Sequence, residues 1–155
     1  MKIKTSRFGE FDIAEESIIS FPDGIIGFER YKGFVILSKK ENAPLRWLQS
    51  VDEPELAFII ISPFIFKADY APDIERQDLM SLQLKSLKEA EILCIVVVPS
   101  NPKDMVANLM APIIINPKLC IGKQAIVRDS SYPTRYRILD TYDKDPRSAH
   151  TVSCK

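Results

Sequence analysis

Residues that carry out acid–base or nucleophilic chemistry are sparse in this 155-residue chain. The one histidine, His150, lies in a polar stretch near the C-terminus. A catalytic histidine needs a partner that fixes its tautomer and a nucleophile within hydrogen-bond reach. The residues around His150 offer neither of these. The sequence therefore predicts no catalytic residue, and we expect the chain not to be an enzyme.

Metal-binding residues are equally scattered. Cys94, Cys120 and Cys154 are far apart and form no Cys-x-x-Cys pair, which fits neither a zinc site nor a disulfide framework. Adjacent acids such as Glu15-Glu16 are more typical of solvated turns than of a calcium site or a carboxylate pair. We expect no metal and no cofactor. Cys94 stands in an apolar run and should be a small buried side chain.

The residues Gly24-Ile25-Ile26-Gly27-Phe28 form the one cluster of glycines. A phosphate-binding loop has more glycines and ends in Lys followed by Ser or Thr, and this cluster has neither property. We interpret it as a turn in which the glycines adopt positive φ.

Charge and hydropathy exclude two further classes. Lys plus Arg and Asp plus Glu both total 21, so the basic excess typical of nucleic-acid binders is absent. The apolar runs are shorter than the roughly 20 residues that span a bilayer, and residues 1–11 lack the apolar stretch of a secretory signal. We expect a cytoplasmic protein that binds neither membrane nor nucleic acid directly.

Short runs rich in isoleucine, valine and phenylalanine alternate with proline, glycine and aspartate, which predicts strands. The expected strands are residues 8–13, 17–21, 33–38, 45–50, 56–62, 92–98, 111–116 and 124–128. Trp47 should enter the core while Arg46 and Leu48 reach outward. The runs 56–62 and 92–98 lack alternation, so they should be central strands covered on both faces.

The remaining segments complete the expected organisation. Mixed periodicity in residues 73–91 predicts one or two short helical turns. Phe58, Phe64 and Phe66 should pack in the core, because their neighbours are aliphatic. We expect a mainly β, single-domain, small barrel-like or sandwich fold over residues 1–140, followed by a polar, flexible tail over 141–155.

Four ordered blocks carry a resemblance to a known family. They are Phe21-Pro22-Asp23-Gly24-Ile25-Ile26-Gly27-Phe28, Trp47-Leu48-Gln49-Ser50 followed by Asp52, Pro54, Ala57 and Phe58, Ala107-Asn108-Leu109-Met110-Ala111-Pro112-Ile113, and Ile115-Asn116. Each block alone is weak, but together they resemble the flagellar assembly factor family FliW over most of the chain.

The resemblance implies a regulatory binding protein of flagellum biogenesis. Such a protein sequesters the translational repressor CsrA and, in a chaperone-like role, binds flagellin. Free flagellin would displace CsrA, which would then silence flagellin messenger RNA until flagellin is exported. The two partners would thus couple flagellin synthesis to flagellar assembly by mass action, with the chain monomeric when free.

The loop residues of these blocks are the candidates for partner contact, because loops on a rigid β scaffold commonly carry binding. They are Asp52, Pro54, Asn108, Pro112 and Asn116. For Asn116, which precedes Pro117, the alternative is that its side chain satisfies backbone groups of a turn.

Two other functions stay open on the sequence alone. A β-barrel can enclose a small ligand in a pocket at one end. A direct RNA-binding module is the second, with Arg128, Arg135 and Arg137 as its basic residues and Tyr132 and Tyr136 as aromatic neighbours.

Overall fold

The computed structural model describes residues 1–128 and 131–139. Its strands are β1 (Lys2–Thr5), β2 (Gly9–Asp12), β3 (Ile19–Ser20), β4 (Gly33–Ser38), β5 (Arg46–Ser50), β6 (Ala57–Ile61), β7 (Glu91–Val97), β8 (Val106–Ala107), β9 (Ile113–Asn116), β10 (Ile121–Gln124) and β11 (Tyr136–Arg137). The helix α1 (Arg76–Ser81) and the 3-10 turns η1 (Glu15–Ser17), η2 (Lys40–Asn42), η3 (Pro63–Ile65), η4 (Leu87–Glu89) and η5 (Pro102–Asp104) connect them.

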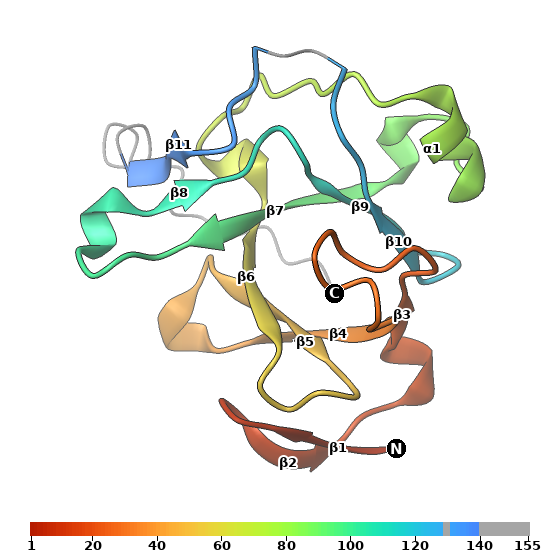
Figure 1. Cartoon of the computed structure of the whole chain (residues 1–155), viewed down its shortest axis with the longest axis vertical. Helices are drawn as coiled ribbons and strands as arrows, with labels where there is room; N and C mark the ends of the chain where they lie inside the picture. The colour runs from red at the N-terminus through yellow and green to blue at the C-terminus, as the bar shows by residue number, and fades with distance from the viewer. Residues whose placement is uncertain (129–130, 140–155) are drawn as a thin grey trace.

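Seven strands close into a barrel (Figure 1), in the order β7-β6-β5-β4-β3-β10-β9, with β9 pairing back onto β7. The strands β8 and β11 extend the sheet beyond β7, and β1 and β2 form a separate hairpin. The expected mainly β, barrel-like fold is therefore confirmed. The expected helical turns within residues 73–91 are confirmed as α1 and η4.

The interior of the barrel is filled by apolar side chains. Residues paired across neighbouring strands share a face, and the cross-strand pairs Phe34 with Ile19 and Leu93 with Ile113 belong to one buried cluster. The fully buried members of this cluster are Phe21, Ile25, Phe34, Leu48, Ile60, Leu93 and Ile113. Their packing holds the strands around a solid core.

A second apolar cluster covers the outer face of β7 and β9. Cys94 on β7 and Ile114 on β9 point outward there and are covered by Phe66, Tyr70 and Leu82 from residues 62–90. Two covered faces explain why the run 92–98 lacks alternation, and the predicted central position of this strand is confirmed. Cys94 is fully buried as predicted, and burial raises the pKa of its thiol.

The prediction that both neighbours of Trp47 reach outward is wrong for Leu48. Leu48 is fully buried inside the barrel, whereas Trp47 lies on the outer face of β5. There the ring of Phe8 packs edge-on against Trp47 at 5.3 Å, and the guanidinium of Arg7 lies 5.5 Å from its ring centre. Both faces of β5 are thus covered, one by the barrel core and the other by the β1–β2 hairpin, in which β1 had not been predicted.

Three further expectations need correction. The strand expected over 124–128 is β10, Ile121–Gln124, although the backbone continues in extended form so that the amides of Ala125 and Val127 donate to Pro112 and Met110. The strand expected over 17–21 shortens to β3, because η1 occupies its start. Phe64 is 43% exposed, since it lies in η3 at the surface, whereas Phe66 is buried as predicted.

The expected tail over 141–155, with His150 and Cys154, lies outside the described residues, and so does the expected domain end at residue 140. Within 1–128 and 131–139, no helix is long and apolar enough to cross a membrane.

Candidate partner-binding surface

The loop of residues 22–32 follows Phe21 and turns sharply at two glycines. Gly24 has φ +70°, and a Cβ there would lie 2.5 Å from the Cα of Glu29. Gly27 has φ +89°. The positive φ predicted for this cluster is therefore confirmed. The turn buries Ile25 and leaves Ile26 and Phe28 exposed, at 56% and 41%.

The loop of residues 51–56, called the acidic loop below, is held by two fully buried polar side chains of β5. The Nε2 atom of Gln49 lies 3.1–3.4 Å from the carbonyl oxygens of four residues, which share its two hydrogens, namely Ser50, Glu53, Pro54 and Leu56. The Oγ atom of Ser50 accepts from the amides of Asp52 and Glu53. Because a buried donor is costly to leave unpaired, these hydrogen bonds favour the observed loop conformation. The buried Oε1 atom of Gln49 has no hydrogen-bond partner within the described part of the chain.

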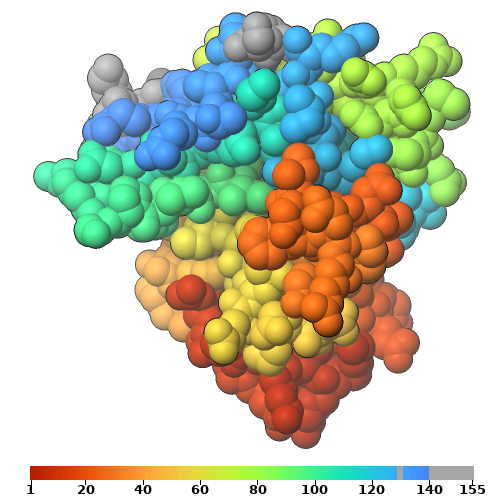
Figure 2. Space-filling model, in the orientation of Figure 1, coloured from red at the N-terminus to blue at the C-terminus, as the bar shows by residue number. Residues whose placement is uncertain are grey.

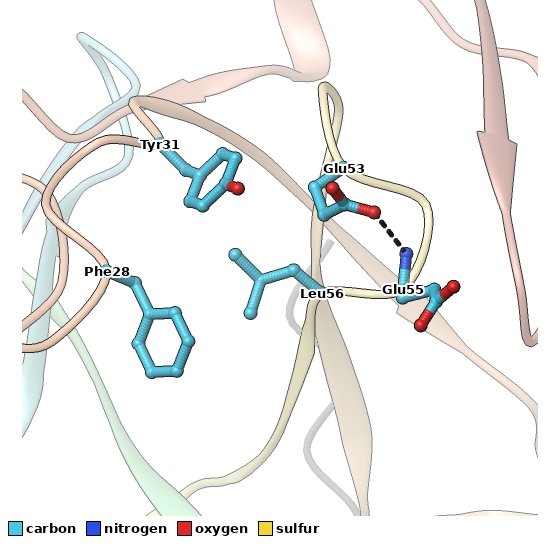
Figure 3. Close-up of a pocket in the computed structure, with 5 residues that line it drawn as sticks. All are labelled: Phe28, Tyr31, Glu53, Glu55 and Leu56. Atoms are coloured by element: carbon cyan, nitrogen blue, oxygen red, sulfur yellow. Dashed lines mark hydrogen bonds between the residues drawn. The ribbon is translucent and has the colours of Figure 1, made fainter.

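These two loops enclose a shallow groove of about 210 Å³, lined by Phe28, Tyr31, Glu53, Glu55 and Leu56. Figure 3 shows the rings of Phe28 and Tyr31 on one side, with the Leu56 side chain pointing toward them and both glutamates beyond it. The amide of Glu55 donates to Glu53 Oε2 at 3.3 Å. In Figure 2 the orange surface, which includes the loop of residues 22–32, adjoins the yellow surface of the segment that leads into β6. The groove thus joins an apolar side to an acidic side.

Gln124 ties the loop of residues 22–32 to a third block. Its Oε1 accepts from the amide of Ile26 at 3.0 Å, and its Nε2 donates to the carbonyl of Ala111 at 3.1 Å. The turn before Ala111 is closed by Asn108, whose Oδ1 accepts from the amides of Met110 and Ala111. Segments far apart in sequence are therefore joined around the groove.

Charged groups near the loops are held by defined contacts. The amide of Gly27 donates to Glu29 Oε2 at 3.0 Å, and this hydrogen bond lowers the pKa of the Glu29 carboxyl. The Nζ atom of Lys123 lies 2.8 Å from Asp78 Oδ1 and 3.5 Å from Asp23 Oδ2, and the hydrogen bond that it donates to Asp78 raises the pKa of its ammonium. Lys123 thus links the loop of residues 22–32 to α1.

The five contact candidates fall in different environments. Asp52 is exposed and Pro54 half-buried in the acidic loop, so the structure brings these two together beside the groove. Asn108 is half-buried, and Pro112 and Asn116 are buried. The Nδ2 atom of Asn116 donates to the Leu82 carbonyl at 2.8 Å, and its Oδ1 accepts from the amides of Lys118 and Leu119.

None of the five residues that line the groove was among the predicted contacts: Phe28, Tyr31, Glu53, Glu55 and Leu56. A signal for the acidic side existed, because Asp52, Glu53 and Glu55 place three carboxylates in four residues without a base. No pattern indicated that Tyr31, about twenty residues earlier, would face them. No group of three His, Cys, Asp or Glu side chains that could hold a metal ion is found in the described part of the chain.

Comparison with known proteins gives a consistent result. The family model described as FliW protein matches residues 2–138. The "Flagellar assembly factor FliW" of Leptospira interrogans serovar Lai is 42% identical over 142 residues, covering 91% of this chain and 95% of that protein. Its namesake from Caldicellulosiruptor bescii is 41% identical over 143 residues, covering 92% and 93%.

A solved structure supports the same assignment. The "Crystal structure of the flagellar assembly factor FliW" superposes with a TM-score of 0.83 at 37% identity, covering 89% of this chain and 96% of that one. Sequence and fold therefore agree over most of the chain, and the chain belongs to the FliW family of flagellar assembly factors.

Proposed function

We propose that this chain is a non-enzymatic, cytoplasmic regulator that sequesters the translational repressor CsrA and binds flagellin. The observation that carries the proposal is membership of the flagellar assembly factor family over residues 2–138. Accumulating flagellin occupies the chain and releases CsrA, which then represses flagellin synthesis. Export of flagellin returns the chain to CsrA. Such a switch runs on the relative concentrations and affinities of two complexes and needs no bond chemistry.

The surface around the groove supports a binding role. Exposed Ile26 and Phe28 stand on a loop whose turns are fixed by glycine, and the facing acidic loop is fixed by Gln49 and Ser50. Apolar side chains on rigid loops lose little conformational entropy when a partner covers them. This arrangement suits recognition of a protein surface, with the chain monomeric when free.

The small-ligand barrel is disfavoured by the packed interior. Phe21, Phe34 and Leu48 are fully buried within the ring of strands, together with the aliphatic residues of the same cluster. A ligand site inside a barrel needs a cavity with a few converging polar groups, and these side chains occupy that space.

Direct RNA binding through the C-terminal arginines is also disfavoured. Arg128 pairs with Asp73 at 2.8 Å and Arg137 with Asp104 at 3.1 Å, so nearby carboxylates offset the charge that phosphates would need. Tyr132 meets Tyr70 edge-on at 4.8 Å and Tyr136 stacks on Phe66 at 5.6 Å; these contacts use the rings for internal packing.

Among the sequence-derived contact candidates, Asp52 and Pro54 stay as proposed contacts, because they lie beside the groove. For Asn108, Pro112 and Asn116 we propose the turn-stabilising role, since their burial and backbone hydrogen bonds already account for them. Alanine variants of Asp52 and Asn116 separate the two roles.

The test is a competition experiment with purified proteins. CsrA from the same bacterium is titrated into the chain by isothermal titration calorimetry, first alone and then with the chain preincubated with flagellin monomer. We expect CsrA to bind alone and flagellin to lower its apparent affinity. Absence of binding by both proteins would refute the proposal. Binding of flagellin messenger RNA in a gel shift without CsrA would favour the RNA-binding function instead.

A further inference from the structure

We propose that the groove of Phe28, Tyr31, Glu53, Glu55 and Leu56 receives a protein segment that presents one bulky apolar side chain flanked by lysine or arginine. This inference rests on the proposed function and deepens it, because it assigns the groove to CsrA, which as a repressor of messenger RNA needs basic residues to bind phosphates and is called the basic partner below. Three features of the groove support this assignment: its incompletely buried apolar side, the charge on its other side, and the rigidity of both.

The apolar side is incompletely buried. The ring of Phe28 packs edge-on against Phe58 at 5.2 Å, yet Phe28 keeps 41% of its surface exposed. Tyr31 and Leu56 are half-buried beside it, and Leu56 points toward both rings (Figure 3). An apolar side chain placed in this shallow groove of about 210 Å³ would contact all three residues and remove their exposed apolar surface from water.

The charge of the lining selects the flanking residues. Both charged residues in the lining are glutamates, and Asp52 adds an exposed carboxylate next to them. Among the described residues, none of these three carboxylates forms an ion pair. Arg30 and Lys32, the sequence neighbours of Tyr31, are not part of the lining, and the Arg30 guanidinium lies 5.8 Å from the centre of the Tyr31 ring. Carboxylates at the edge of an apolar contact favour a cationic segment and repel an acidic one.

Both sides of the groove are formed before a partner arrives. Gln49 Nε2 contacts four carbonyls of the acidic loop and the adjoining strand ends, and Ser50 Oγ contacts two amides. Across the groove, Gln124 holds the amide of Ile26. A preformed site avoids the conformational entropy cost of ordering loops on binding. A short segment that makes few contacts can therefore bind to it.

The experiment measures CsrA affinity for four variants of the full chain. Phe28→Ala removes the apolar side and Glu55→Gln removes one charge without removing a contact of the exposed side chain. The matched controls are Val97→Ala, an exposed apolar residue on β7, and Glu10→Gln, an exposed acid on β2. We expect Phe28→Ala to lower the affinity for CsrA at least about tenfold, because aromatic anchors commonly carry much of the binding free energy. Glu55→Gln should lower the affinity for CsrA about threefold and make this affinity less dependent on salt concentration. The affinities of both control variants should stay within about twofold of wild type.

Thermal melts of each variant exclude unfolding as the cause, and Glu55→Gln keeps the test valid if Phe28→Ala destabilises the chain. Wild-type affinity in both groove variants would overturn the inference while leaving the proposed function intact. Loss of flagellin binding with CsrA unaffected would overturn the assignment to the basic partner. Concentration-dependent dimerisation abolished by Phe28→Ala would instead assign the groove to a second copy and equally overturn it.

A partner-independent probe covers the case in which CsrA does not bind at all. The capped peptides Lys-Phe-Lys and Glu-Phe-Glu are titrated separately while the amide resonances of Phe28, Tyr31 and Leu56 are followed by NMR. The inference predicts shifts at these amides with the basic peptide and none with the acidic one. Equal shifts with both peptides, or shifts confined to other residues, would overturn it.

Discussion

The Oε1 atom of Gln124 accepts a hydrogen bond from the backbone amide of Ile26 at 3.0 Å, although 98 residues separate the two in sequence. The other end of the same side chain donates to the carbonyl of Ala111 at 3.1 Å. One amide side chain therefore joins the glycine turn that carries Phe28 to the segment that enters β9. The position of the exposed apolar residues depends on the barrel through this contact.

We predict that Gln124→Leu lowers the free energy of unfolding by about 1–2 kcal/mol, because the partly buried Ala111 carbonyl loses its side-chain donor. Urea denaturation measures this. CsrA affinity should fall as well, because the loop loses its anchor next to Phe28. Gln124→Glu keeps an acceptor for the Ile26 amide and should retain more of the affinity than Gln124→Leu. Equal affinities in the two variants would show that the Ile26 contact does not position the loop.

A second prediction concerns Gly122 on β10. A Cβ at this position would lie 2.8 Å from the Cζ atom of Phe21, whose ring is fully buried in the barrel. Gly122→Ala should therefore cost about 1–3 kcal/mol by overpacking, measured as a fall in urea midpoint with unchanged slope. The same substitution in a Phe21→Leu background should cost less, because the smaller side chain leaves room. A penalty that is the same in both backgrounds would place the cause in the backbone.

The fold class and most strands could be predicted from sequence because the signals are local. The run 33–38 predicts β4 with its observed bounds, Gly33–Ser38, and Gly24 and Gly27 predict the turn that they form. The predictions fail where the burial of a side chain depends on segments that are distant in the sequence. Leu48 alternates with Trp47 and looked exposed, but β5 is covered on one face by the core and on the other by the β1–β2 hairpin.

The sequence indicated residues beside the groove but did not indicate which residues line it. Asp52 and Pro54 belong to a recognisable block, but Tyr31 faces Glu53 only because β4 and β5 pair in a register that aligns Phe34 with Ser50. Asn116 shows the opposite case: its block marked it as notable, and the Leu82 carbonyl that it contacts lies 34 residues away. Long-range pairing of this kind leaves no periodic trace in one sequence.

Asn116 supplies the third prediction. Its side chain makes one donated and two accepted backbone hydrogen bonds, to Leu82, Lys118 and Leu119. Asn116→Ala should therefore lower the free energy of unfolding by about 1–3 kcal/mol, with CsrA affinity unaltered at temperatures where the variant is folded. Asp52→Ala is the matched comparison. It should lower the affinity for CsrA and leave the free energy of unfolding unchanged, because Asp52 is exposed in the acidic loop. Lost affinity without lost stability in Asn116→Ala would return it to the interface.

The last prediction concerns the buried hydroxyl of Tyr70, which donates to the Leu109 carbonyl at 2.6 Å. Burial, followed by the nearby Cys94 and Tyr132, raises the pKa of Tyr70. An unfolded chain releases this proton near pH 10, whereas the folded chain retains it. The stability that Tyr70 contributes is therefore fully present below about pH 10 and is lost as pH rises above that value.

Tyr70→Phe should lower the free energy of unfolding by about 1–2 kcal/mol at neutral pH, because the Leu109 carbonyl loses its donor. The difference from wild type should shrink between about pH 9 and pH 11, since phenylalanine does not titrate. Burial also raises the pKa of the Cys94 thiol, so Cys94 likewise lowers the stability of the folded chain as the pH becomes alkaline. Both proteins are therefore compared in a Cys94→Ala background. Urea denaturation across this range provides the measurement. A difference that stays constant with pH would mean that the Tyr70 hydroxyl ionises equally in the folded and unfolded chains, and the buried contact with Leu109 would then not hold its proton.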